Sequence, residues 1–203
     1  LKDFIDGQNK NEKTSMTVIT FNTDRSTETT TTSMKTLVKD EDIKTKMKMR
    51  DTNTNVSGYP ATLVYDYLKN TLYGQLPSDL QAAIKPTRVI SGYGPNDSTN
   101  FTTTDNLYLL SSEEVYGIDD GQYHFYDTAY GTSHQLEYYS NNGVTYSTNS
   151  WSGRNLDKAV KQYNSSNTWW WLRSADSDSI NRFRSVDSYG YLGSITASST
   201  GGV

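Results

Sequence analysis

The sequence predicts an α+β fold, in which two short helices and several short strands are joined by long polar loops. Apolar residues recur at helical spacing between residues 60 and 84. Short β-branched or aromatic runs elsewhere are separated by turn-forming residues. Hydrophobic residues make up only 33% of the 203 residues, yet aromatics reach 12% and include 16 Tyr. Because disordered chains lack such rings, these aromatics indicate a folded domain with a sizeable core.

The two helices are predicted on either side of Gly74. Pro60 suits the first turn of the first helix, and Gly74 fits its C-terminal stop. A second short helix is expected from Leu76 to Ile84, ending before Pro86. The apolar positions that carry the first helix are Leu63, Val64, Tyr67, Leu68 and Leu72.

A shorter helical segment is expected after a polar cap near residue 111. Ser111 or Ser112 would cap it, and Glu113 and Glu114 would lie in its first turn, where carboxylates suit the helix dipole. This capping role explains the paired carboxylates better than glycosidase chemistry does, because nothing in the sequence identifies two carboxyl groups at the separation that such chemistry needs.

Strands are predicted from the remaining short apolar runs. The expected strands are Met16–Phe21, one beginning at Val89, and a buried one at Leu107–Leu110. A polar loop is expected over residues 92–104. The Thr-rich tract Thr27–Thr32 is read as an exposed β edge or loop rather than an O-glycosylated stalk. Residues 118–163 form an insertion-like stretch, with short strands and a helix expected at 156–163.

Three consecutive tryptophans, Trp169 to Trp171, concentrate apolar surface at one point of the chain. In a strand, Trp169 and Trp171 would face one side while Trp170 and Leu172 face the other, which is typical of a central strand. The following residues are small, polar and turn-prone, and they include two tyrosines, Tyr189 and Tyr191, that we expect on the surface. Paratopes use the same residue types. We therefore expect a rigid aromatic floor beneath a ligand-facing C-terminal surface.

Several function classes are disfavoured by composition. A net charge of -4 argues against binding to a phosphate backbone, and no window approaches the roughly 20 apolar residues of a membrane span. Cysteine is absent, and the two histidines, His124 and His134, belong to no metal or catalytic motif. A calcium loop starting at Asp51 would lack its glycine at Val56 and its bidentate glutamate at Thr62. No cofactor or metal is therefore expected. Because the chain begins at Leu1, we expect further sequence upstream.

The residues Trp170-Trp171-Leu172-Arg173-Ser174, with the later Gly201-Gly202-Val203, resemble the C-terminal half of a family of bacterial and phage surface domains. That family is a branch of the C-type-lectin-like fold, shared with the formylglycine-generating enzyme and with the variable proteins of diversity-generating retroelements. The resemblance runs from about Lys35, so we divide the chain into an N-terminal extension (1–34) packed on a domain (35–203) with an insertion at about 118–163. It implies two short helices, small antiparallel sheets and long loops.

This resemblance implies a non-catalytic ligand-recognition domain with a variable surface, outside the cell, on a bacterial cell surface or a phage virion. Its ligand would be a protein or glycan on a cell surface, not nucleic acid. The chemistry of the formylglycine-generating branch needs reactive cysteines, which this chain lacks, so no enzyme is expected. A static structural or adhesive module without diversification is the alternative. The residues implied to vary and contact ligand are Asp176, Asp178, Ser179, Asn181, Arg182, Ser185, Asp187, Ser188, Tyr189, Tyr191 and Ser194. Those implied to form the fixed scaffold are Trp170, Trp171, Leu172, Arg173, Phe183, Val186 and Gly190.

Overall fold

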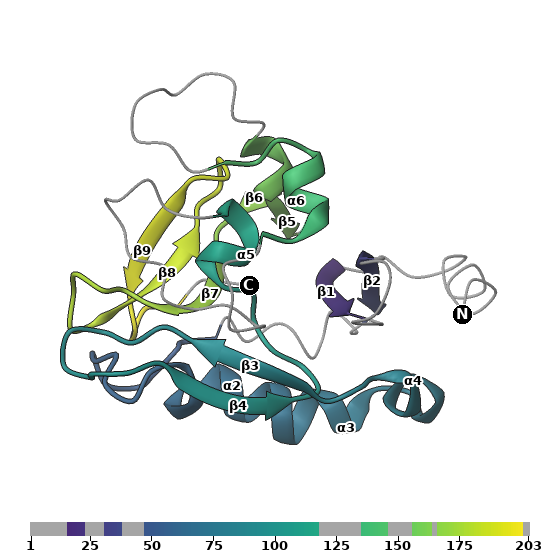
Figure 1. Cartoon of the computed structure of the whole chain (residues 1–203), viewed down its shortest axis with the longest axis horizontal. Helices are drawn as coiled ribbons and strands as arrows, with labels where there is room; N and C mark the ends of the chain where they lie inside the picture. Colours follow the sequence, from purple (N-terminus) through teal and green to yellow (C-terminus); the bar gives the residue numbers. More distant parts are fainter. Residues whose placement is uncertain are drawn as a thin grey trace.

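The computed structural model describes residues 47–117, 135–145, 156–163 and 166–200 in full, and the backbone alone of residues 16–22 and 31–37. Within these residues the chain is α+β, with short helices and small antiparallel sheets, as the sequence predicts (Figure 1). The expectations for His124, His134 and the terminal residues 201–203 lie outside the described residues, as do Thr27 to Thr30.

An antiparallel hairpin comes first in the chain. It pairs β1 (Met16–Asn22) with β2 (Thr31–Leu37), with Ile19 opposite Met34. The strand predicted at Met16–Phe21 is confirmed, and the end of the Thr-rich tract forms the start of β2. The packing of the 1–34 extension on the domain stays a prediction.

A continuous helical region follows a 3-10 turn, η1 (Tyr59–Ala61). It comprises α2 (Leu63–Tyr67), the π-helical turn η2 (Leu68–Leu72) and α3 (Tyr73–Gln75). Thr62 caps α2 by accepting the Tyr65 N–H at its hydroxyl. The predicted stop at Gly74 is wrong, because the helix runs one residue further. The second helix is confirmed as α4 (Ser78–Ala83).

Residues 87–105 form a two-stranded sheet of β3 (Thr87–Ser91) and β4 (Phe101–Asp105). The loop predicted over 92–104 is therefore too long, since its last four residues belong to β4. The strand predicted at Leu107 to Leu110 is wrong, because these residues form no strand, although Leu107 and Leu110 are buried. The capped helix is confirmed as α5 (Ser112–Tyr116).

The described parts of the insertion-like stretch contain short elements. They are α6 (Glu137–Asn141), the 3-10 turn η3 (Leu156–Ala159) and β5 (Lys161–Tyr163), which pairs with β6 (Ser166–Thr168). The helix predicted over 156–163 thus ends early, and β5 replaces its second half.

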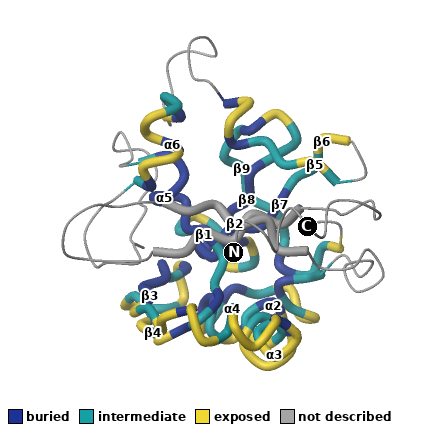
Figure 2. The backbone as a smooth tube through the Cα atoms, turned by 90° about the vertical axis from the view of Figure 1, so that its right-hand side faces the viewer, coloured by how far each residue is buried: buried dark blue, intermediate teal, exposed yellow. Residues whose placement is uncertain are grey.

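The C-terminal sheet has the strand order β7-β8-β9, formed by β7 (Trp170–Ala175), β8 (Arg182–Val186) and β9 (Leu192–Thr196). All six residues of β7 are buried. Trp170 and Leu172 pack into one apolar cluster together with α5 and α6, whereas Trp171 packs into a second with Tyr59 and Phe183. The predicted alternation of the tryptophans is confirmed, because Trp170 and Trp171 pack into different clusters. Figure 2 shows most of β8 in the colour of buried residues.

The prediction that this strand is central is wrong, because β8 occupies that position and β7 lies at the edge of the three-stranded order. The segment before α5 covers the outer edge of β7, where the Arg173 N–H donates to the Leu110 carbonyl at 2.9 Å. Opposite β8, the β7 ladder has an irregularity: Trp171 pairs with Ser185 and Ala175 with Phe183, so three residues of β7 face one of β8.

Candidate functional site

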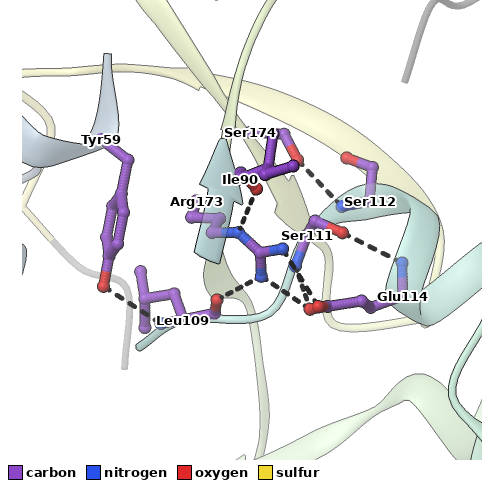
Figure 3. Close-up of polar contacts among 8 residues, drawn as sticks. All are labelled: Tyr59, Ile90, Leu109, Ser111, Ser112, Glu114, Arg173 and Ser174. Atoms are coloured by element: carbon purple, nitrogen blue, oxygen red, sulfur yellow. Dashed lines mark hydrogen bonds and ion pairs between the residues drawn. The ribbon is translucent and has the colours of Figure 1, made fainter. Parts of the chain in front are cut away.

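A buried ion pair anchors the C-terminal sheet to helix α5 (Figure 3). The Arg173 guanidinium donates through Nη1 to Glu114 Oε2 at 2.6 Å and through Nη2 to Glu114 Oε1 at 3.0 Å. Its Nε and Nη1 also donate to the carbonyl oxygens of Ile90 at 3.1 Å and Leu109 at 2.8 Å. Side-chain exposure is 0% for Arg173 and 1% for Glu114. A fully buried bidentate pair with further backbone partners ties β7, β3 and the 109–114 segment together.

The same carboxylate completes the cap of α5. Ser111 Oγ accepts the Glu114 N–H at 3.0 Å, and Glu114 Oε2 accepts the Ser111 N–H at 2.9 Å, which is a capping box. The Ser112 N–H donates to Ser174 Oγ, and the Leu109 N–H donates to the Tyr59 hydroxyl. Burial raises the pKa of Tyr59 well above its ordinary value of 10.0. These contacts are structural.

The seven residues implied to form the scaffold all lie in the interior. Exposure is 2% or less for the six that carry large side chains: Trp170, Trp171, Leu172, Arg173, Phe183 and Val186. Gly190 is also buried. The two indole N–H groups donate to backbone carbonyls, that of Trp170 to Ala159 and that of Trp171 to Met47. Buried tryptophans with satisfied N–H groups make a stiff support.

One end of β8 continues into the β7–β8 loop (residues 176–181), which is held by Asn55. The Asn55 Nδ2 group lies 3.2 Å from the Asp176 carbonyl, 2.6 Å from that of Ser179 and 2.9 Å from that of Arg182. The Asn55 N–H also donates to the Ile180 carbonyl at 2.9 Å. Asn55 is fully buried, and a Cβ atom at Gly94 would lie 2.4 Å from its Oδ1, so only glycine fits beside it.

Charged contacts brace the same loop. Arg184 Nη2 lies 3.3 Å from Asp176 Oδ1 and 3.9 Å from Asp178 Oδ2. Asp176 Oδ1 also accepts the Asp178 N–H at 2.9 Å, and Ser179 Oγ donates to Asn181 Oδ1 at 2.7 Å. Asp176 is 4% exposed and Arg184 is 6% exposed. The placement of Asp176 on a ligand-facing surface is therefore corrected: its side chain is buried in the fold.

The other end of β8 continues into the β8–β9 turn (residues 187–191), whose own backbone groups accept or donate the hydrogen bonds that fix it. Asp187 Oδ1 accepts the N–H groups of Tyr189 at 2.8 Å and Tyr191 at 2.9 Å. Gly190 has φ +87°, and a Cβ there would lie 2.0 Å from the Leu156 carbonyl oxygen. The Tyr116 hydroxyl donates to the Gly190 carbonyl at 2.7 Å. The turn is thus fixed without using the Tyr189 side chain, which is 73% exposed.

The residues implied to contact ligand therefore divide between the two ends of β8 rather than forming one patch (Figure 1). Because β8 has five residues, the ends are roughly 15 Å apart. Ser185 is 1% exposed and is also corrected to the interior. Ser194 lies half-buried on β9, opposite Arg184. Asp178, Ser179, Asn181 and Arg182 lie at the β7–β8 end, and Asp187, Ser188, Tyr189 and Tyr191 lie at the β8–β9 end.

A polar chain elsewhere in the domain links Lys69, Tyr65 and Asp105. Lys69 Nζ donates to the Tyr65 hydroxyl at 3.3 Å, and that hydroxyl donates to Asp105 Oδ1 at 2.9 Å. Burial, more than the hydrogen bond to Asp105, raises the pKa of Tyr65 above its ordinary value.

Lys161 lies on the face of Trp170, with Nζ 3.9 Å from the ring centroid. The side chain is half-buried, and its desolvation lowers the pKa of Lys161 to about 8. This cation–π contact fixes β5 against the aromatic floor.

No group of three or more His, Cys, Asp or Glu side chains that could hold a metal ion occurs among the residues that the structure describes. Over the same residues, no helix has the length and apolar character needed to cross a membrane.

Residues 33–203 match the family described as a domain of unknown function (DUF6273), and the chain belongs to this family. No curated protein and no solved structure matches the chain.

Sequence reasoning missed two residues that organise this region. Asn55 lies in a run of Asx, Ser and Thr residues of the kind that bonds to its own backbone, and the Thr54 hydroxyl does accept the Val56 N–H in this way. Asn55 instead bonds to residues 121 to 127 positions later, which no local pattern reveals. Glu114 was predicted as a cap only. The buried arginine of the tryptophan motif was the available signal that a buried carboxylate must exist somewhere in the chain.

Proposed function

We propose that this chain is a non-catalytic ligand-recognition domain of a surface protein, with a C-type-lectin-like fold, displayed on a bacterial cell or phage virion. The observation that carries the proposal is the contrast within residues 170–191. The side chains of Trp170, Trp171 and Leu172 are buried at 2% exposure or less. Tyr189, only three residues after buried Val186, is 73% exposed. Burial of one set and exposure of the other is what a fixed floor with a replaceable surface requires.

Turn construction supports the same proposal. In the β8–β9 turn, conformation is set by Asp187, by Gly190 and by the Tyr116 hydroxyl. The side chains of Ser188 and Tyr189 are free of these roles, so they can change without loss of the turn. Rigid presentation of a tyrosine reduces the entropy lost when a ligand binds.

The proposal extends to diversification, by a retroelement, of those positions in the two turns that are exposed or half-buried. Its test is the nucleotide sequence around the gene. A reverse transcriptase gene, together with a near-copy of the 3′ end that differs at adenines opposite the codons for Asp178, Ser179, Asn181, Arg182, Ser188, Tyr189 and Tyr191, is the expected finding. A locus lacking both would remove diversification and leave the recognition role to be tested separately.

A static structural or adhesive module is the second candidate. The bracing of the β7–β8 loop favours it, because Asp176 is buried beside Arg184 and the loop carbonyls are held by Asn55. Changing the buried residues Asn55, Asp176 or Arg184 would disturb packing, which fits a loop whose sequence is fixed.

Recognition is tested by binding of the fluorescently labelled chain to a panel of intact bacterial cells, measured by flow cytometry. A variant with alanine at the exposed residues Asp178, Arg182 and Tyr189 and at half-buried Ser188 should lose binding while keeping its unfolding curve. The matched control is Tyr138→Ala, which removes a 43% exposed ring from α6, an element that carries none of the residues implied to contact ligand. Equal binding by the wild type and the four-site variant would refute the recognition role.

A further inference from the structure

We propose that the outer edge of β9 pairs with the same edge of a second copy of this chain, so that two C-terminal sheets join into one across a twofold axis. The proposal is independent of the recognition function, because it concerns an edge of the sheet and neither of its turns.

The outer edge of β9 presents backbone hydrogen-bonding groups. Within the described residues β9 pairs with β8 and with no other strand, and it lies on the left of the sheet in Figure 1. The Asp176 N–H donates to the Arg182 carbonyl at 3.0 Å, so the backbone groups of Arg182 point to β7. Those of Phe183, one residue on, point to β9, where Phe183 pairs with Ile195. Because this direction alternates along a strand, the N–H and C=O groups of Ser194 point away from β8.

This edge is open and unblocked. All five residues of β9 are half-buried, whereas four of the five residues of β8 are buried. No other described segment hydrogen-bonds to the backbone groups of Leu192 or Ser194. Proteins block exposed edges with charges, prolines or bulges, but the five residues Leu192–Thr196 contain no charge and no proline, and their register with β8 is regular. An edge of this kind is a template for a further strand.

Gly193 indicates that something approaches β9 closely. The residue has no positive φ, and a Cβ atom there would lie 3.5 Å from Ser185 Oγ, which is an ordinary contact distance. The packing within one chain therefore leaves room for a side chain at this position. Glycine inside a strand weakens it, and it often marks a place where another backbone approaches.

A second copy of β9 fills the space beside Gly193. In an antiparallel pairing centred on Ser194, the two Ser194 residues face each other, and Ile195 of each copy faces Gly193 of the other. The branched side chain and the glycine lie on either side of Ser194, so each knob meets a gap on the other copy. The outward backbone groups of Ser194 then bond to each other, as do those of Leu192 and Thr196.

Charge does not oppose this pairing. The row of side chains that starts at Arg182 continues on the second copy through Leu192 and Val186, which are uncharged. The row that starts at Arg184 crosses the two facing Ser194 residues, so the two arginines are three strand spacings apart, about 14 Å. That separation exceeds the Debye length of about 8 Å at physiological ionic strength, and each Arg184 guanidinium already lies beside a carboxylate.

The first experiment measures the wild type alone. Sedimentation velocity should show a shift from monomer to dimer between about 5 μM and 1 mM, the range for an interface smaller than the standard size. Over the same range, amide exchange measured by NMR should slow for Ser194, whose N–H points outward, and stay unchanged for Ile195, whose N–H points to β8. A chain that is monomeric at every concentration overturns the proposal. So does a Ser194 amide that is equally protected throughout, because another segment of the chain would then cover the edge.

Two variants locate the contact. Gly193→Val fills the space that the second copy needs, and Ser194→Pro removes the outward N–H. Each should weaken the dimer by about tenfold or more while leaving the urea midpoint of the monomer unchanged, since Ser194→Pro alone removes two hydrogen bonds from the pair. Thr104→Val, at an exposed position of β4, is the control and should associate as the wild type does. A dimer that persists in both variants would overturn the proposal, and if a variant fails to fold, the exchange of the wild-type amides decides.

Discussion

The buried Arg173–Glu114 pair gives the sharpest stability prediction. Glu114→Gln keeps the size of the side chain but removes the charge that faces the guanidinium, and it places an amide where one of two acceptor oxygens stood. Arg173 is 0% exposed, so water cannot replace the lost partner. Breaking a buried pair by changing one member costs about 3–5 kcal/mol. For a domain of this size we therefore expect the midpoint of thermal unfolding to fall by roughly 6–20 °C.

The assays are thermal unfolding and urea unfolding, both followed by tryptophan fluorescence, because Trp170 and Trp171 lie on the strand that carries Arg173. Glu137→Gln is the matched control, since Glu137 is exposed on α6 and its change should cost no more than about 0.5 kcal/mol. If Glu114→Gln unfolds within about 0.5 kcal/mol of the wild type, the pair does not anchor the sheet as described.

Further variants test the floor, the turn and the buried ionisable groups. Trp171 is 2% exposed, so Trp171→Ala leaves a cavity and should lower the free energy of unfolding in urea by about 3–5 kcal/mol. A variant as stable as the wild type would contradict the burial of this ring. Tyr189→Ala should unfold within about 0.5 kcal/mol of the wild type, because its ring is 73% exposed; a large loss would place the ring in the core. Gly190→Ala should cost about 2 kcal/mol or more, since the residue has φ +87° and no room for a Cβ; an unchanged urea midpoint would show that the turn relaxes. Folding lowers the pKa of Lys161 from 10.5 to about 8. Between these two pH values the unfolded chain therefore holds a proton on Lys161 that the folded chain has lost, so the free energy of unfolding should rise with pH across this window. Burial raises the pKa of Tyr59, so the free energy of unfolding should fall again above about pH 10, where tyrosines of the unfolded chain ionise. Urea midpoints of the wild type and of Lys161→Met, measured from pH 7 to 11, check the rise and the fall. Identical pH profiles of the two proteins would reject the contribution of Lys161.

Local periodicity predicted the elements whose partners lie close in sequence. The alternation of Trp170 and Trp171 followed from the period of a strand. The cap of α5 followed from two serines before two carboxylates, although the pattern left open which serine is the cap. The central position assigned to β7 was wrong because burial on both faces does not report what covers an edge, and here a non-strand segment does so through Leu110.

Long-range pairing accounts for most of the remainder. Asn55 and Arg173 bond to groups that are 121 to 127 and 59 residues away, respectively, and neither distance leaves a trace in local pattern. Gly74 was a reasonable helix stop by residue type, but the π-helical turn before it carries the chain on to Gln75. The division of the candidate surface into two ends could not be seen without the strand order, since only the meander places the two turns at opposite ends of β8.

The irregular ladder of β7 has a consequence for insertions and deletions in this family. Between Trp171 and Ala175, the strand uses four steps where β8 uses two, from Ser185 to Phe183. Two surplus residues leave the inside–outside phase intact, so Trp171 and Ala175 pack into the same cluster. Deleting one residue there would turn the later side chains of β7 to the opposite face of the sheet, whereas deleting two would keep them on their present faces. Relatives that keep this sheet should therefore differ in length here only by an even number.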